Sequence, residues 1–429
     1  MLELLKTIIA DFHRRKLPAD IARRELSIPL KPARVATVVG PRRAGKTYLL
    51  YSLIQRLEQN IPRERIVYID FADERLTIGA EQLQLVLDAY QQLFPKVDPK
   101  DVYWFFDEIQ EVPGWEKFVR RLESTVTKKI FLTGSSSKLL SREIASVLRG
   151  RTVSYELLPF SFREYLGYRS IDSADVHSTR NKNLIAAQFE LFLSTGGYPE
   201  IFDFDDENRV RTLQSYVDIM LYRGIIERYR LSQTFVVRDM MRRLIAGNAC
   251  LFSVHKYYNE LKSRGVRIGK DALYEFLNHF TDAYLVFQLN KYDRSVAKRE
   301  QALKKIYVND TGLGSAYNFD LSRNVGRMLE AMIFLELRKA GRTTYYAGGN
   351  GECDFLIQEG QRIVSAVQVC HRLDDGNRTR EIRGLTDTLE RFRLPEGLIL
   401  TSGQEREMES AGKKISIKPA WKWILEQKQ

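Results

Sequence analysis

The sequence predicts an α/β protein that is divided into several domains. A glycine-rich, phosphate-binding pattern stands between a short β-prone run and a segment of helical spacing. Strand-like and helix-like segments then alternate, which is typical of a parallel sheet covered by helices. At 429 residues the chain exceeds one ordinary hydrophobic core, and about three domains are expected.

The phosphate-binding loop is the firmest chemical signal. It fits G-x-x-x-x-G-K-[ST] at every fixed position. Backbone N–H groups of such a loop surround a phosphate, and the following helix N-terminus adds positive charge. Lys46 is expected to reach the β- and γ-phosphates of ATP, and Thr47 to bind Mg²⁺. The predicted nucleotide site consists of Gly40, Pro41, Arg42, Arg43, Ala44, Gly45, Lys46, Thr47 and Tyr48.

Two acids complete the pattern of an ATPase. The apolar run 102–106 ends in Asp107 and Glu108, and ligands bind at this end of the strands in a parallel sheet. Asp107 is expected to hold Mg²⁺ through water. Glu108 is expected to orient and deprotonate the attacking water.

Two further features leave alternatives open. The run 129–132 leads into a serine-rich turn, in which Ser135 or Ser136 senses the γ-phosphate or merely forms the turn. Arg149 and Arg151 follow a helix expected over 137–148. Either arginine could stabilise phosphoryl transfer in a neighbouring subunit, or both could form a solvated surface pair.

The motifs between residues 40 and 166 resemble archaeal and bacterial AAA-type ATPases with a C-terminal region of uncharacterised function. They are GPRRAGKT, FFDEIQEVPGW, LTGSSS, LRGR and LPFSFREYL. The resemblance implies an AAA+-like P-loop domain over residues 1–170. It also implies that Arg149 and Arg151 lie at a contact between subunits, so that self-association into a homo-oligomeric ring is expected.

The middle of the chain predicts a helical bridge over 183–247, preceded by a polar linker at 171–181. Residues 248–310 then follow the order helix, glycine turn, helix and two strands around a basic loop, which predicts a winged-helix domain. DNA is the expected partner, and a protein contact is the alternative. The candidate DNA-binding residues are Lys262, Arg264, Arg267, Lys270, Arg294, Lys298 and Arg299.

The last part of the chain places Glu330 on a helix, Asp354 on a strand, and the triplet Gln368-Val369-Cys370 on a further strand. This layout resembles the PD-(D/E)xK nuclease fold and implies an α/β, restriction-endonuclease-like domain over 320–429. An active member has a carboxylate and a lysine where this chain has Gln368 and Cys370, and neither residue supplies that charge. Asp354 and Glu330 are metal ligands only if the site is active. We expect DNA binding or docking without cleavage.

Composition limits the remaining classes. The net charge of +12 fits an acidic polymer as partner, although a large surface can also spread such an excess. No apolar run reaches the ~20 residues that cross a bilayer, and the N-terminal segment lacks a secretory signal. The three cysteines and five histidines show no metal-binding spacing. A cytoplasmic protein without a membrane partner is expected.

These observations favour an oligomeric AAA+-type ATPase that hydrolyses ATP with Mg²⁺ to act on DNA, by binding, remodelling or repair-associated processing. Other DNA-processing proteins are possible partners. One alternative is a structure-selective, Mg²⁺-dependent DNA nuclease with a regulatory ATPase. The other is a nucleotide switch that regulates through protein contacts.

Overall fold

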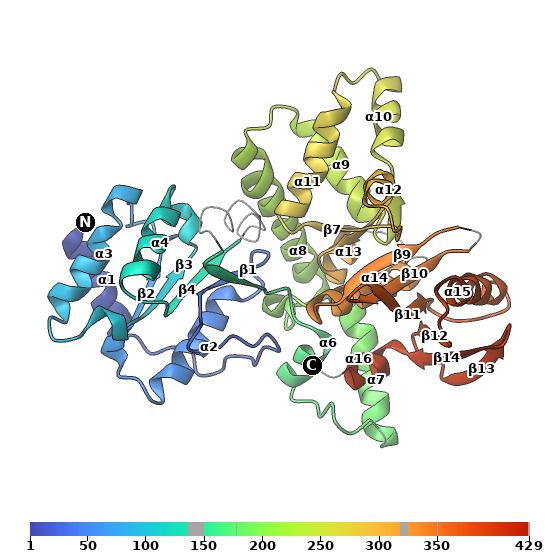
Figure 1. Cartoon of the computed structure of the whole chain (residues 1–429), viewed down its shortest axis with the longest axis horizontal. Coiled ribbons are helices and arrows are strands. Elements are labelled where there is room, and N and C mark those ends of the chain that lie inside the picture. Colours follow the sequence, from blue (N-terminus) through green and yellow to red (C-terminus); the bar gives the residue numbers. More distant parts are fainter. Residues whose placement is uncertain (136–149, 177, 318–324, 350, 428–429) are drawn as a thin grey trace. The chain divides into compact units, whose positions relative to one another are not determined.

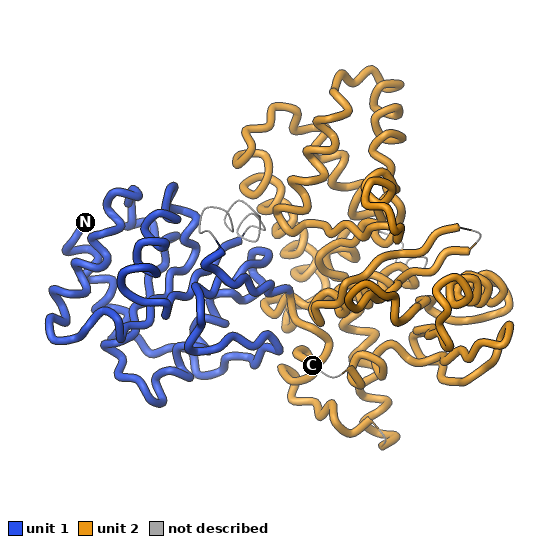
Figure 2. Tube along the Cα trace, viewed as in Figure 1, with its two compact units in different colours: residues 1–158 blue, residues 159–429 orange. Residues whose placement is uncertain are grey.

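The computed structural model divides into two compact units, unit 1 with residues 1–158 and unit 2 with residues 159–429 (Figures 1 and 2). The structure describes residues 1–135, 150–176, 178–317, 325–349 and 351–427. The helix expected over 137–148 lies outside these residues.

Unit 1 is built on a parallel sheet with the strand order β2-β3-β4-β1-β5. The inner strands are buried on both faces and therefore read as continuous apolar runs. The predicted parallel sheet is confirmed, and β5 is an additional edge strand. The strands are β1 (Val35–Val39), β2 (Ile66–Asp70), β3 (Tyr103–Asp107), β4 (Ile130–Gly134) and β5 (Thr152–Glu156).

Helices cover both faces of this sheet. Alternate side chains of β3 point to opposite faces, so Trp104 packs into one core cluster and Phe105 into another. The first cluster contains α1, α3 and α4, and the second contains α2. Between β2 and β3 the chain forms a 3₁₀ turn, Ala80–Gln82, followed by α3. The helices are α1 (Leu2–Arg14), α2 (Lys46–Glu58), α3 (Gln84–Leu93) and α4 (Trp115–Thr125).

Unit 2 begins with helices. The polar segment expected as a linker runs only to Ser178, whose hydroxyl accepts the N–H of Asn181 and caps α7. A π-helical turn, Tyr222–Glu227, follows α8. The helices are α6 (Phe162–Tyr168), α7 (Thr179–Thr195), α8 (Asp206–Leu221), α9 (Thr234–Ala246) and α13 (Thr311–Tyr317).

A buried aspartate fixes the glycine turn after α7. Asp310 accepts the N–H groups of Gly197 at 2.7 Å and Gly312 at 2.9 Å. A Cβ on Gly196 would lie 2.0 Å from Asp310 Oδ1, so this position excludes side chains. Burial raises the pKa of Asp310 to about 6, although the backbone hydrogen bonds that it accepts act to lower it.

A three-stranded antiparallel sheet with the order β6-β8-β7 follows. Both predicted helices and both predicted strands are present. The basic loop is not simply a loop, because residues 296–301 form α12, capped by the hydroxyl of Ser295. The elements are β6 (Cys250–Phe252), α10 (Val254–Ser263), α11 (Lys270–Asp282), β7 (Val286–Leu289), α12 (Val296–Gln301) and β8 (Lys304–Val308).

The C-terminal part of unit 2 contains a mixed sheet with the order β13-β14-β12-β11-β10-β9. On β10, Phe355 stacks against Phe334 of α14, whereas Leu356 joins the core cluster that contains α15. Helices thus pack against both faces of the sheet. The elements are α14 (Val325–Lys339), β9 (Thr343–Ala347), β10 (Cys353–Glu359), β11 (Arg362–Val369), α15 (Arg378–Phe392), β12 (Glu396–Thr401), β13 (Arg406–Ser410), β14 (Lys413–Pro419) and α16 (Ala420–Glu426).

Among the described residues, none of the helices combines the length and the apolar character that a bilayer span requires.

Candidate nucleotide site

The phosphate-binding loop joins β1 to α2, as its pattern predicts. A Cβ on Gly40 would lie 1.9 Å from the carbonyl oxygen of Leu157, so only glycine fits there. Gly45 has φ +92° and immediately precedes α2, a conformation that side chains disfavour. The two glycines therefore fix the loop where the helix N-terminus can meet an anion.

Lys46 turns its ammonium group inward. Nζ donates to the carbonyl oxygens of Gly40 at 3.2 Å and Pro41 at 3.1 Å. It also lies 3.6 Å from Glu108 Oε1. Burial lowers the pKa of Lys46, and the carboxylates of Glu108 and Asp107 oppose that shift. Among the described residues this buried cation is held by two carbonyls and one long ion pair, and it is poised to exchange these contacts for a phosphate.

Asp107, the last residue of β3, is the centre of a hydrogen-bond network. Its Oδ2 accepts the hydroxyl of Thr47 at 2.7 Å and that of Tyr68 at 2.8 Å. Its Oδ1 accepts the hydroxyl of Thr133. Thr47 and Asp107 thus present hard oxygen ligands side by side, the donor type that suits Mg²⁺.

Glu108 follows in a left-handed backbone conformation, with φ +48°. Its N–H donates to the hydroxyl of Thr133 at 2.9 Å, and Gln110 donates to its carboxylate. The Glu108 side chain remains 23% exposed, so water has access to it. This backbone conformation, stabilised by Thr133, sets the direction of the glutamate side chain.

Thr133 is a site residue that the sequence interpretation missed. It is the penultimate residue of β4, the strand between β1 and β3, and therefore lies between the loop and the two acids. A signal was present, because a polar residue at this strand end faces the same edge as Asp107. The sequence interpretation placed this role two residues later, at Ser135, which is half-buried, or at Ser136, which lies outside the described residues.

Arg24 is a second residue whose role the sequence did not reveal. Its guanidinium donates to the carbonyl oxygen of Ala44 at 2.8 Å and to that of Leu158 at 2.6 Å. The planar fork of an arginine suits two such acceptors. Arg24 therefore ties the loop to the segment that follows β5.

Asp70 ends β2 and pairs in register with Asp107 across the sheet. Burial raises the pKa of Asp70 to about 6, with further increases from the charges of Asp107 and Glu108. The carboxyl group accepts the N–H of Ala72 at 2.9 Å. Three acids therefore lie along the edge of the sheet that carries the loop.

Arg151 lies at the opposite end of the parallel strands from the phosphate-binding loop. Its carbonyl accepts the N–H of Val35, the first residue of β1, whereas the loop follows the last residue of that strand. The guanidinium donates to Glu123 at 3.1 Å and is 39% exposed. Arg149 lies outside the described residues. Arg151 is therefore not placed to contact a nucleotide on its own subunit.

Replacing Thr133 by valine is expected to slow ATP turnover roughly 10- to 100-fold, because both hydrogen bonds that position Asp107 and Glu108 are lost. Thr37→Val is the matched control. Thr37 is buried in β1, and its hydroxyl has no hydrogen-bond partner in the described part of the chain. Steady-state phosphate release measures both variants, and equal rates in the two would show that the Thr133 network has no role in catalysis.

The candidate DNA-binding cations are exposed, with one exception. Arg299 is half-buried and donates to the hydroxyl of Tyr345 at 3.1 Å. Arg264 lies 3.8 Å from Asp239, which partly neutralises it. The exposed residues are Lys262, Arg264, Arg267, Lys270, Arg294 and Lys298.

The structure also locates the predicted residues of the C-terminal region. Asp354 and Glu330 are both buried and lie together, joined by Lys305 of β8. Gln368 accepts the N–H of Asp354 at 3.3 Å and donates to Glu381 at 2.5 Å. A cation therefore lies beside Asp354 and Glu330, on a strand far from the triplet in the sequence.

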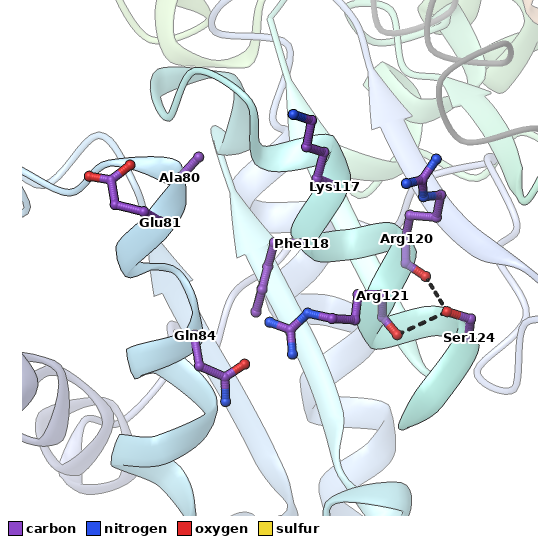
Figure 3. Close-up of a pocket in the computed structure, with 8 residues that line it drawn as sticks. All are labelled: Ala80, Glu81, Gln84, Lys117, Phe118, Arg120, Arg121 and Ser124. Atoms are coloured by element: carbon purple, nitrogen blue, oxygen red, sulfur yellow. Dashed lines mark hydrogen bonds between the residues drawn. The ribbon is translucent and has the colours of Figure 1, made fainter.

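Unit 1 has a further cavity of about 480 Å³ beside α4 (Figure 3). The hydroxyl of Ser124 donates to the carbonyl oxygens of Arg120 and Arg121 beside it. The cavity shares no residue with the phosphate-binding loop. Its lining residues are Ala80, Glu81, Gln84, Lys117, Phe118, Arg120, Arg121 and Ser124.

Residues 32–166 match the family described as AAA domain, and unit 1 thus carries a P-loop ATPase domain of the AAA class. Residues 186–323 match a domain of unknown function, DUF8612. The chain is 34% identical to the uncharacterized protein MJ1544 of Methanocaldococcus jannaschii over 98% of this chain and 95% of that protein, and it belongs to the family of that protein. An uncharacterized protein of Haemophilus influenzae is 27% identical over 80% of this chain and 83% of its own length.

Solved structures with some likeness include Cdc6p from Pyrobaculum aerophilum, at 12% identity and a TM-score of 0.26, covering 78% of this chain and 93% of that one. The Aeropyrum pernix Orc1 protein in complex with DNA has 14% identity and a TM-score of 0.23, covering 76% and 93%. Likeness at this level says nothing about how this chain acts.

Proposed function

We propose that this chain is an oligomeric AAA+-type ATPase that hydrolyses Mg-ATP to act on DNA. The observation that carries the ATPase part is the network in which Asp107 accepts hydrogen bonds from Thr47 and Thr133, while Thr133 also accepts the N–H of Glu108. This network holds Thr47, Asp107 and Glu108 together at the C-terminal ends of the strands before any ligand is bound.

Each residue has a separate task in the proposed reaction. Lys46 and the loop N–H groups stabilise the charge that develops on the phosphoryl oxygens. Thr47 and Asp107 would hold Mg²⁺, which would neutralise charge on the phosphates of ATP. Glu108 orients the attacking water and accepts its proton.

An arginine from a neighbouring subunit completes the proposed site. Arg149 and Arg151 remain the candidates, because the position of Arg151 at the opposite end of the strands from the loop favours action on another subunit. For that role Arg151 has to leave Glu123, an ion pair in which the arginine is 39% exposed. The side chain of Glu123 is 9% exposed, so the phosphate in the neighbouring subunit has to replace a counter-charge that the arginine gives up.

The DNA part of the proposal depends on unit 2. The helices α10 and α11, the glycine turn between them and the strands β7 and β8 have the order of a winged helix. The turn displays Lys262, Arg267 and Lys270 to solvent. In this reading residues 183–247 form the helical bridge, 248–310 the winged helix and 320–429 a nuclease-like domain that binds or docks without cutting. The ATPase domain spans 1–170, and the site of action is the cytoplasm.

A second set of cations strengthens the case for a nucleic-acid partner. Five arginines of the π-helical turn and its surroundings are exposed, and they form no ion pair with another described residue. The guanidinium of Arg238 lies 4.8 Å from the ring of Tyr222, which joins α9 to this turn. Unpaired arginines are well suited to phosphate contacts. They are Arg223, Arg228, Arg230, Arg238 and Arg242.

If unit 2 binds DNA through the glycine turn, Lys262→Ala/Arg267→Ala should lower the affinity at least tenfold at low salt. The slope of log K against log[salt] should become shallower by about 1.8, since each phosphate contact contributes about 0.9. Fluorescence anisotropy with labelled duplex and single-stranded DNA measures both. Lys414→Ala, at an exposed lysine of β14, is the control. Unchanged slopes with intact binding would place the DNA elsewhere.

A nucleotide switch that acts through protein contacts is the second candidate. The observation that favours it is the exposed face of α11, where Asp271 and Glu275 accompany Lys270 and Tyr274. Acids on this face repel phosphate and suit a protein partner. If the wild-type chain binds no DNA at 50 mM salt, this candidate replaces the DNA part of the proposal while the ATPase part stands.

A further inference from the structure

A single lysine lies at the centre of a group of acids in unit 2. Nζ of Lys305 is 2.8 Å from Glu352 Oε1, 2.9 Å from Asp354 Oδ1 and 3.1 Å from Glu330 Oε1. The acids belong to α14, to β10 and to the segment just before β10. The lysine side chain is only 4% exposed, so this is a built site rather than a surface ion pair.

The same acids have further hydrogen-bond donors. The hydroxyl of Tyr307 donates to Glu330 Oε1 at 2.7 Å, and the N–H of Val369 donates to Asp354 Oδ2 at 2.9 Å. Burial opposes the charged form of Lys305, but the carboxylates raise its pKa well above the usual value. The ammonium group is therefore a permanent charge of this cluster.

We propose that Lys305 is an internal cation that takes the place of a metal ion in this carboxylate site and fastens the three-stranded sheet to the six-stranded sheet. The inference rests on the proposed function, in which residues 320–429 form a nuclease-like domain with a carboxylate site. It goes further, because it assigns that site a structural role without a metal ion. Its tests are independent of ATP and of DNA binding.

Distances and charges make lysine and metal mutually exclusive. The oxygens surround Nζ at 2.8–3.1 Å, whereas Mg²⁺ requires oxygens at about 2.0–2.1 Å and Ca²⁺ at about 2.3–2.6 Å. A divalent ion on the same oxygens would lie next to the ammonium group. Like charges at such a separation repel strongly where water is excluded. The ammonium already satisfies the oxygens that a metal would need.

Other contacts show that the cluster lies where the three-stranded sheet meets α14 and the six-stranded sheet. Tyr307 of β8 stacks on Phe334 of α14, with ring centroids 4.1 Å apart. The hydroxyl of Tyr346 in β9 donates to the carbonyl oxygen of Leu303 at 2.6 Å, just before β8. Tyr346 also accepts the N–H of Tyr292 at 2.9 Å. Lys305 adds a charged link to a contact that also includes aromatic packing, side-chain hydrogen bonds and backbone hydrogen bonds.

Binding of Mn²⁺ to the nucleotide-free, full-length chain tests the proposal, with free Mn²⁺ measured by electron paramagnetic resonance. The single substitutions Asp354→Asn and Glu352→Gln should leave Mn²⁺ binding the same as in the wild type. Lys305→Ala should gain a site at least tenfold tighter than any in the wild type, and Lys305→Ala/Asp354→Asn should lose it. Weaker Mn²⁺ binding in Asp354→Asn or Glu352→Gln than in the wild type would overturn the proposal, even if Lys305→Ala fails to fold.

Thermal unfolding gives a second readout. Removing the cation leaves buried carboxylates without a counter-charge, so Lys305→Ala should lower Tm by about 5–15 °C. Millimolar Mn²⁺ should restore part of that loss in the variant and leave the wild type unchanged. Lys304→Ala, on the same strand, is the control and should shift Tm by a few degrees at most. Mn²⁺-dependent DNA cleavage by the wild type that Asp354→Asn abolishes would also contradict the proposal.

Discussion

Glu108→Gln is expected to bind ATP as tightly as the wild type and to turn it over about 10²- to 10⁴-fold more slowly, the usual contribution of a general base. Glutamine keeps the size of the side chain and the hydrogen bond between the Glu108 N–H and Thr133. It cannot accept the proton of the attacking water. Nucleotide binding by fluorescence titration and turnover by phosphate release separate the two effects.

Glu111→Gln provides the control for that variant. Glu111 is exposed in the short 3₁₀ turn that follows Glu108, so the substitution makes the same change in charge close by. We expect its turnover to stay within a factor of two of the wild type. Turnover at the wild-type rate in Glu108→Gln would show that Glu108 is not the general base. Asp70 would then be the nearby acid to test.

Lys46→Met is expected to weaken ATP binding by at least 100-fold, because charge-assisted contacts to phosphate oxygens are lost in a site with little water. Methionine keeps the apolar stem and removes the charge, so the carbonyl oxygens of Gly40 and Pro41 lose the N–H donors of Lys46. Isothermal titration with a non-hydrolysable ATP analogue measures the affinity.

Folding and binding have to be separated for this variant. Thermal unfolding without nucleotide should give a Tm close to that of the wild type, since the cost of burying the Lys46 charge offsets its two carbonyl hydrogen bonds and its ion pair of 3.6 Å. Lys31→Met, at an exposed lysine ahead of β1, should bind the analogue normally. Unchanged affinity in folded Lys46→Met would mean that the loop does not hold the phosphates.

The nucleotide site was largely predictable because its signals are local. The loop requires glycine at fixed positions for close backbone approach and positive φ, and the two acids follow a strand whose burial on both faces makes it plainly apolar. Thr133 was missed because its role depends on strand order. Only the position of β4 between β1 and β3 brings its hydroxyl to Asp107.

Elements with weak local patterns escaped prediction. The edge strand β5 is half-exposed, so its residues carry no continuous apolar run. Helix α12 has no buried residue and reads as a basic loop. Lys305 stands 49 residues from Asp354 in a segment predicted to serve a different domain, and such a contact arises only from the tertiary fold.

The most direct test of the central claim is the steady-state rate of ATP hydrolysis by the full-length chain with Mg²⁺, alone and with single-stranded, duplex or branched DNA. The proposal predicts a basal rate that Lys46→Met and Glu108→Gln abolish and that at least one form of DNA changes several-fold at low salt. A rate that survives in both variants would contradict the assigned ATPase site. A rate that no DNA alters, together with no DNA binding, would contradict the assigned partner.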